Sequence, residues 1–299
     1  MKYQDAAAFR MALEQQLKDG ASDGSALSRD RKRVAFDRLL VRLQAVAEDR
    51  WVLKGGFALD LRLAARARST KDVDIEWRAE EGEMADTMLD AAEHDAGDFF
   101  VLAIERTGTP ADRLGGAHRF RVSASLASRP FETFLLDVGL RTSEAAGVET
   151  LRTDDLLAFA GIEPIRIPAV PLELQIAEKL HAYTQTYEGG RGSTRVKDLV
   201  DLALIAELSS LDATALRQEI DWIFGRRETH SAPRALPSPP PEWALPYGRL
   251  AEEVGISADL AAGHREAAAM LDPVLGEEIT EGQWSPAGRA WSGEARHGR

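Results

Sequence analysis

Three carboxylates alternate with apolar residues in the segment 70–77, whose sequence is TKDVDIEW. Because successive side chains of a strand point to opposite faces, Asp72, Asp74 and Glu76 share one face and the apolar residues share the other. Acids aligned in this way repel one another unless a positive charge lies between them, and a hard divalent cation takes oxygen ligands. The segment therefore predicts a strand whose Asp72 and Asp74 serve metal-dependent phosphate chemistry. The alternative is the solvated face of an edge strand.

A pair of glycines, Gly55-Gly56, follows a short apolar segment and precedes a helical one. Glycines at such a turn let backbone N–H groups approach a ligand closely, and a helix N-terminus favours an anion. Together with Lys54, the pair is interpreted as a cradle for a nucleoside triphosphate. The alternative is an ordinary strand-to-helix turn that needs a positive φ angle. The spacing of a Walker A loop is missing.

Asp137 is a lone carboxylate in the apolar segment 134–138, FLLDV. A buried charge without a partner is costly, so Asp137 requires either a metal ion or a basic side chain. In the first case it joins Asp72 and Asp74 in holding one or two Mg²⁺ ions, which would align the phosphates of a nucleotide. In the second case it forms a salt bridge to a nearby arginine.

Lys179 lies in an amphipathic helical segment, and Asp198 and Asp201 lie in the next one. The two acids are three residues apart and share a helix face. We expect Lys179 to neutralise phosphate charge in a transition state, with Asp198 or Asp201 orienting it. The alternative, a salt bridge between the two helices, is compatible with that role. The histidines show no metal-ligand spacing, and His181 is expected to be structural.

The elements that must position these residues change in character along the chain. Residues 1–163 predict a mixed α/β domain, and residues 164–299 predict a mainly helical one. The predicted strands cover 51–53, 70–77, 99–104, 119–125 and 131–140, and the predicted helices cover 3–18, 29–48, 57–66, 81–93, 172–187, 195–208, 212–224 and 258–271. The segment 161–171, with three prolines, is predicted to be an extended connector or an edge strand, and 233–246 an irregular wrap.

Composition limits the classes of function. The net charge of −12 argues against broad, non-specific nucleic-acid binding but allows a local contact. The absence of cysteine excludes disulfides and thiolate metal sites. No apolar run reaches the roughly 18 residues of a membrane span, and the N-terminus lacks the apolar core of a secretory signal. A cytoplasmic protein is expected.

These features, in this order, resemble the AbiEii nucleotidyltransferase toxins, a family that includes the MenT toxins of mycobacteria. The resemblance spans roughly residues 30 to 290. It rests on the Gly-Gly helix start, the Thr-x-Asp-x-Asp strand, the later strand aspartate, Glu-Lys-Leu-x-Ala at 178–182, and Arg-x-Lys-Asp-x-x-Asp at 195–201. Many nucleotidyltransferases have Gly-Ser at the first motif. Here backbone N–H groups or Thr70 would replace the serine hydroxyl.

The resemblance implies an N-terminal domain of the polymerase-β-like nucleotidyltransferase fold, with a mixed sheet, followed by a helical C-terminal domain. It implies transfer of a nucleoside monophosphate from a nucleoside triphosphate, often a pyrimidine one, to the 3′ acceptor end of tRNA, which blocks aminoacylation. Mg²⁺ would be the cofactor and a cognate antitoxin the partner. Two alternatives remain: the acceptor is a protein or small-molecule hydroxyl, or the chain is a catalytically silent partner of an antitoxin or a nucleic acid.

By position, the resemblance assigns Asp72 and Asp74 as catalytic metal carboxylates and Asp137 as the third. Lys179 and Asp198 match the distal catalytic pair, with Asp201 as a rival for the second place. Thr70 matches a hydroxyl residue that an antitoxin phosphorylates in some members. The expected nucleotide-binding residues are Lys54, Gly55, Gly56, Thr70, Arg195 and Lys197.

Overall fold

The computed structural model describes residues 1–63, 66–108, 117–140, 147–185 and 195–293. It divides into two compact units, each described here by itself. The first consists of Met1–Arg62 and Ser69–Val170, and the second of Leu63–Arg68 and Pro171–Arg299. The short segment 63–68 thus belongs with the later part of the chain. Within the described ranges, no helix is both long enough and apolar enough to cross a bilayer.

The first unit is built on a seven-stranded mixed sheet, in the order β3-β4-β5-β2-β1-β7-β6. The β2–β5 and β1–β7 pairs are parallel, and the other neighbours are antiparallel. The strands are β1 (Trp51–Lys54), β2 (Asp72–Trp77), β3 (Phe100–Arg106), β4 (His118–Leu126), β5 (Arg129–Leu140), β6 (Glu149–Arg152) and β7 (Arg166–Ala169). A mixed sheet with helices, as predicted, is therefore confirmed.

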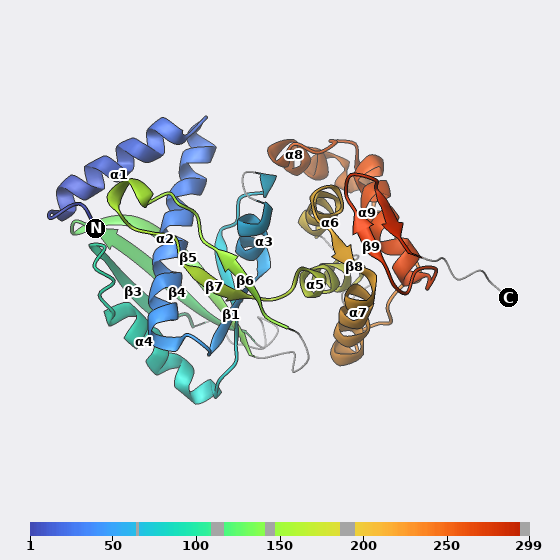
Figure 1. The fold of residues 1–299 in the computed structure, drawn as a ribbon, viewed down its shortest axis with the longest axis horizontal. Helices are drawn as coiled ribbons and strands as arrows, with labels where there is room; N and C mark the ends of the chain where they lie inside the picture. Colours follow the sequence, from blue (N-terminus) through green and yellow to red (C-terminus); the bar gives the residue numbers. More distant parts are fainter. Residues whose placement is uncertain (64–65, 109–116, 141–146, 186–194, 294–299) are drawn as a thin grey trace. The chain divides into compact units, whose positions relative to one another are not determined.

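Helices cover one face of this sheet. The elements are α1 (Ala6–Gly20), α2 (Gly24–Ala47), α3 (Gly55–Leu63) and α4 (Met84–Glu93), with short 3₁₀ turns at Glu81–Glu83 and Ala158–Ala160. Asp5 and Asp23 cap α1 and α2 by accepting hydrogen bonds from N–H groups of the first turn. Figure 1 shows α1, α2 and α4 against the sheet, where Val73, Ile75 and Trp77 of β2 are fully buried. Asp72 and Asp74, which alternate with these apolar residues, consequently lie on the opposite face of the strand.

The second unit is mainly helical over its described residues. Its helices are α5 (Leu172–Thr184), α6 (Val196–Leu208), α7 (Ala213–Arg227), α8 (Ala244–Val254) and α9 (Leu260–Leu275), with a 3₁₀ turn at Pro241–Trp243. A small antiparallel sheet in the order β10-β9-β8 joins them, built from β8 (Leu211–Asp212), β9 (Gln283–Ser285) and β10 (Ala290–Ser292). These three strands were not predicted, because two or three residues are too few to show alternation.

Two predictions for proline-rich segments need correction. Strand β7, in the segment 161–171, is not at an edge, because it pairs with both β1 and β6. Pro168 lies opposite β6, while the β1 side is joined by the N–H of Val170, which donates to the carbonyl of Leu53 at 2.9 Å. The segment 233–246 ends in the first turn of α8, where a proline is tolerated because its N–H would have no helical partner.

One predicted helix ends earlier than expected, since α5 ends at Thr184 and Gln185 is extended. Helix α3 is described as far as Leu63. The remaining predicted positions 64–65 and 186–187 lie outside the described residues.

Candidate functional site

One register row of the large sheet carries four charged side chains. Lys54 of β1 lies opposite Asp74 of β2, Asp74 lies opposite Asp137 of β5, and Asp137 lies opposite Arg119 of β4. Residues in register share a face, so the order across four strands is cation, acid, acid, cation. The fold therefore brings the predicted carboxylates of β2 and β5 side by side, with a basic residue at each end. We call these four residues the charged row.

Gly55 joins the charged row to the start of α3. The helix begins directly after β1, and Gly55 has a φ angle of +67°, the positive φ that the alternative of an ordinary strand-to-helix turn required. A Cβ atom at this position would lie 2.6 Å from Cγ of Asp74 and closer still to a carboxylate oxygen. Only glycine therefore satisfies both the backbone conformation and the close approach of Asp74.

Gly55→Ala is expected to destabilise the protein by about 1–2 kcal/mol through backbone strain alone. It must also push the Asp74 carboxylate aside, and a displacement of about 1 Å lowers catalysis on the order of a hundredfold. Urea denaturation and an activity assay measure the two effects. Gly161→Ala is the matched control, because Gly161 has a φ angle of +71° and the atom nearest to a Cβ there is Cγ of the Lys2 side chain, at 3.3 Å. Equal activity losses in both variants would contradict the role given to Gly55.

Asp137 forms a salt bridge to Arg119, which confirms the alternative given for it from the sequence. The guanidinium donates from Nε to Oδ1 and from Nη2 to Oδ2, both at 2.6 Å. The hydrogen bonds to Asp137 raise the pKa of Arg119 above its usual value, and the charges of Asp72 and Asp74 raise it further. Arg119 was missed by sequence reasoning, since strand alternation was the only signal at that position.

The carboxylates of β2 and β5 provide only part of the oxygen-ligand set that a hard divalent cation needs. Among the described residues, no three histidine, aspartate or glutamate side chains form a ready group for holding a metal. Asp72 and Asp74 lie on one half-buried strand face, and the hydroxyl of Thr70, itself buried, donates to Asp72 Oδ1 at 3.4 Å. Both oxygens of Asp137 are bound by Arg119. Asp72 and Asp74 therefore offer oxygen ligands of the kind that a divalent ion takes, whereas Asp137 would join them only if Arg119 released it.

A second charged cluster lies inside the helical unit. Nζ of Lys179 on α5 is 2.6 Å from Oδ2 of Asp201 and 3.7 Å from Oδ1 of Asp198, both on α6. Arg68 binds the Asp201 carboxylate with two hydrogen bonds, at 2.9 and 3.0 Å. Burial would raise the pKa of Asp201, but the charges of Lys179 and Arg68 outweigh it and lower the pKa. The predicted interhelical salt bridge is confirmed, with Asp201 as the nearer acid.

The remaining predicted residues lie at the start of α6. Arg195 is the residue before the helix, and its Nε is 3.3 Å from Oδ2 of Asp198. Lys197 is exposed to solvent. Arg68, which holds Asp201, was not predicted, because its partner is 133 positions away in the sequence.

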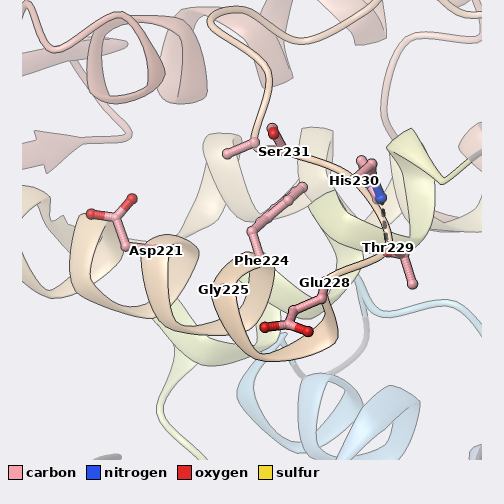
Figure 2. Close-up of a pocket in the computed structure, with 8 residues that line it drawn as sticks. Asp221, Phe224, Gly225, Glu228, Thr229, His230 and Ser231 are labelled. Atoms are coloured by element: carbon pink, nitrogen blue, oxygen red, sulfur yellow. Dashed lines mark hydrogen bonds between the residues drawn. The ribbon is translucent and has the colours of Figure 1, made fainter.

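A pocket of about 430 Å³ opens where α7 ends, and Figure 2 shows the residues that line it. His230 and Thr229 lie on its wall, joined by a hydrogen bond of 2.9 Å. Behind them, the Thr229 hydroxyl also contacts Nε2 of the buried His181 at 2.8 Å. Nε2 of His230 lies 2.7 Å from the hydroxyl of Thr184, which donates to the carbonyl of Leu180.

Arg227 fixes the direction of the hydrogen bonds at His181. Its guanidinium can only donate, so Nδ1 of His181 accepts at 3.3 Å and Nε2–H of His181 donates to the Thr229 hydroxyl. Since the Thr184 hydroxyl donates to Leu180, it accepts from Nε2–H of His230. The His181 imidazole is therefore neutral. This confirms the prediction that His181 has a structural role, tying α5 to the residues after α7.

The chain of hydrogen bonds predicts a loss of stability in acid. Burial, then the charge of Arg227, then His230 lower the pKa of His181 to about 4, while Phe224 covers its ring and Glu178 lies 3.7 Å from Arg227. The unfolded chain takes up this proton near pH 6.5 and the folded one does not, so the unfolding free energy falls between about pH 6.5 and 4. The lowering of this pKa from 6.5 to about 4 corresponds to roughly 3 kcal/mol.

The measurement is urea denaturation at pH 7.5 and pH 5. His181→Gln should flatten the difference between the two pH values. His264→Gln serves as the control, since it removes a histidine of α9 whose Nε2 lies 3.0 Å from the carbonyl oxygen of Leu236. If the unfolding free energy of His181→Gln still differed between the two pH values as it does in the natural protein, this histidine would not be the group responsible.

Comparison with known proteins agrees with the geometry. Residues 38–285 match the family model "Nucleotidyl transferase AbiEii toxin, Type IV TA system". No curated protein matches the sequence. Among solved structures, the chain is similar to MenT4, the nucleotidyltransferase toxin Rv2826c of Mycobacterium tuberculosis H37Rv. The identity is 17% and the TM-score 0.55, over 90% of this chain and 98% of MenT4.

A further similar structure is JHP933 from Helicobacter pylori, at 14% identity and a TM-score of 0.46, over 86% of this chain and 94% of that one. The family model covers most of the chain, including the charged row and the Lys179 cluster. The chain therefore belongs to the AbiEii family of nucleotidyl transferase toxins, the toxin components of type IV toxin–antitoxin systems, and a cognate antitoxin is its implied partner.

Proposed function

We propose that this toxin transfers a nucleoside monophosphate, of a pyrimidine nucleotide by preference, from a nucleoside triphosphate to the 3′ acceptor end of tRNA in a Mg²⁺-dependent reaction. The product would no longer accept an amino acid, and translation would stop in the cytoplasm. The observation that carries the proposal is the charged row, with paired carboxylates of β2 and β5 beside the N-terminus of α3.

The residues of the row have distinct roles in this proposal. Backbone N–H groups of Gly55 and Gly56, at a helix N-terminus, would receive the triphosphate, and the ammonium group of Lys54 would offset its charge. Asp72 and Asp74 would hold the Mg²⁺, with Asp137 as the third ligand. The bound ion supplies charge neutralisation and a lower pKa for the acceptor hydroxyl.

The reaction itself is an in-line displacement. The acceptor hydroxyl oxygen forms a bond to the α-phosphorus and its proton is released to solvent, while the bond from that phosphorus to the bridging oxygen breaks and pyrophosphate leaves. Lys179 would counter the negative charge, together with Arg195 and Lys197, while Asp198 orients the Lys179 ammonium. These roles rest on the family resemblance and on the buried ammonium held between two carboxylates.

A second candidate keeps the donor half and changes the acceptor. Transfer to a protein or small-molecule hydroxyl would use the same carboxylates and glycines. The net charge of −12 favours a small contact with any nucleic acid, such as one tRNA end, over an extended one.

The test is to incubate the protein with Mg²⁺, total tRNA and each α-³²P-labelled nucleoside triphosphate in turn, then separate RNA, protein and small molecules. Label on the tRNA 3′ end, strongest with a pyrimidine nucleotide, is expected. Label on protein or on a small molecule would favour the second candidate. No turnover with any nucleotide would leave a silent binding partner of the antitoxin as the better description.

A further inference from the structure

Arg119 is the charged-row residue to which the proposed reaction gives no task. Its guanidinium donates from Nε and Nη2 to the two oxygens of Asp137. The side chain is nonetheless 28% exposed, and that of Asp137 17% exposed. A pair of this exposure is open to solvent on one side, so its two partners can separate without a rearrangement of the core.

The charges around Arg119 explain why it occupies this position. Asp72, Asp74 and Asp137 all act on its guanidinium. Asp74 and Asp137 are directly opposite each other on neighbouring strands, an arrangement of like charges that destabilises a sheet. Arg119 at one end of the row and Lys54 at the other balance these two acids.

We propose, resting on the proposed function, that Arg119 is a resident counter-ion. It holds Asp137 while no divalent cation is bound, competes with the cation for that carboxylate, and on release pairs with the triphosphate. Arg119 occupies both oxygens of Asp137, so a cation that takes either oxygen competes with at least one of its hydrogen bonds. A guanidinium freed in this place carries the planar donor fork that suits phosphate oxygens.

The competition has a direct readout that does not involve turnover. Mn²⁺ binding to the nucleotide-free protein, followed by electron paramagnetic resonance, is expected to tighten by about tenfold in Arg119→Ala, because the cation no longer displaces an arginine. Arg119→Lys should lie between that variant and the natural protein, since an ammonium cannot bind both oxygens at once. Weaker or unchanged Mn²⁺ binding in Arg119→Ala would overturn the proposal.

Two further variants separate competition from a general change in charge. Arg121→Ala removes a cation from the same strand and the same face, two positions from Arg119, and should change Mn²⁺ affinity little. In an Asp137→Asn background, the effect of Arg119→Ala should disappear, because the contested carboxylate is gone. If Arg119→Ala raised the Mn²⁺ affinity equally with Asp137 and with Asp137→Asn, the effect would come from the overall electrostatic field. That result would reject competition at Asp137.

The second half of the proposal is tested by nucleotide binding. Arg119→Ala should weaken the binding of a non-hydrolysable nucleoside triphosphate in the presence of Mn²⁺, by about tenfold. Failure here can be told apart from failure of the proposed function. If Mn²⁺ competition is seen without transfer to any acceptor, the counter-ion role stands alone. If transfer occurs without competition, or no variant binds Mn²⁺, the counter-ion role is wrong.

Discussion

Asp72→Ala is expected to lower nucleotidyl transfer by at least about 10³-fold while leaving the protein folded. Asp72 is at the start of β2 on the face opposite the core, so its removal takes away a carboxylate without opening a cavity. The loss follows because the neighbouring Asp74 alone cannot hold and orient a divalent ion for in-line attack. Label transfer from an α-³²P-labelled nucleoside triphosphate measures it.

The control for this variant is Glu105→Ala. Glu105 of β3 lies opposite Arg121 of β4, and Arg121 lies opposite Leu135, which in turn lies opposite Asp72. The Glu105→Ala variant therefore removes an acid from the same face of the sheet, three strands away from Asp72, at an exposed position on the edge strand β3. Glu105→Ala should keep its activity. Full activity in Asp72→Ala would show that the metal assignment is wrong.

Asp201→Asn is expected to destabilise the helical unit by about 3–5 kcal/mol, the cost of leaving a buried charge without its partner. Asp201 is fully buried and is the acid between Lys179 and Arg68. Asparagine keeps the shape but cannot neutralise either cation, so Lys179 and Arg68 would face each other with one charge uncompensated. Urea denaturation at pH 7.5 gives the change in unfolding free energy.

Asp198→Asn is the matched comparison, since Asp198 lies on the same helix, is nearly as buried and is 3.7 Å from Lys179. Its effect on stability should be much smaller, because Asp201 stays in contact with the ammonium at 2.6 Å. Its effect on transfer should be large if Asp198 orients Lys179. A folded Asp198→Asn variant with full activity would move the orienting role to Asp201.

Sequence patterns predicted the elements of the sheet well where strands are long. The alternation in β2 placed Val73, Ile75 and Trp77 in the core and left Asp72 and Asp74 on the other face, as the structure shows. Glu76 continues the alternation but is buried and bound to Arg78 at 3.0 Å, apart from the charged row. Short strands such as β6 and β8 to β10 could not be predicted from alternation, because their pairing depends on distant chain segments.

The acids and glycines of the candidate site were predicted from the sequence, whereas its arginines were missed. An aspartate in an apolar strand is unusual and draws notice, whereas an arginine in an alternating strand is ordinary. The partner of Asp137 could be foreseen as an arginine, but the choice of Arg119 requires the register between β4 and β5. The contact between Arg68 and Asp201 likewise depends on tertiary structure that local sequence does not contain.

The charged row also has a consequence for how the chain folds. Strand pairs can slip in register, and a slip of one residue turns every side chain to the opposite face. If β2 slipped by one position against β5, Asp74 would meet Leu136 or Val138, both fully buried, in place of Asp137. The carboxylates would enter the core without Lys54 and Arg119. The same residues that are proposed to serve the chemistry thus disfavour misaligned assembly of the central strands, so neutralising them is expected to reduce folding fidelity as well as activity.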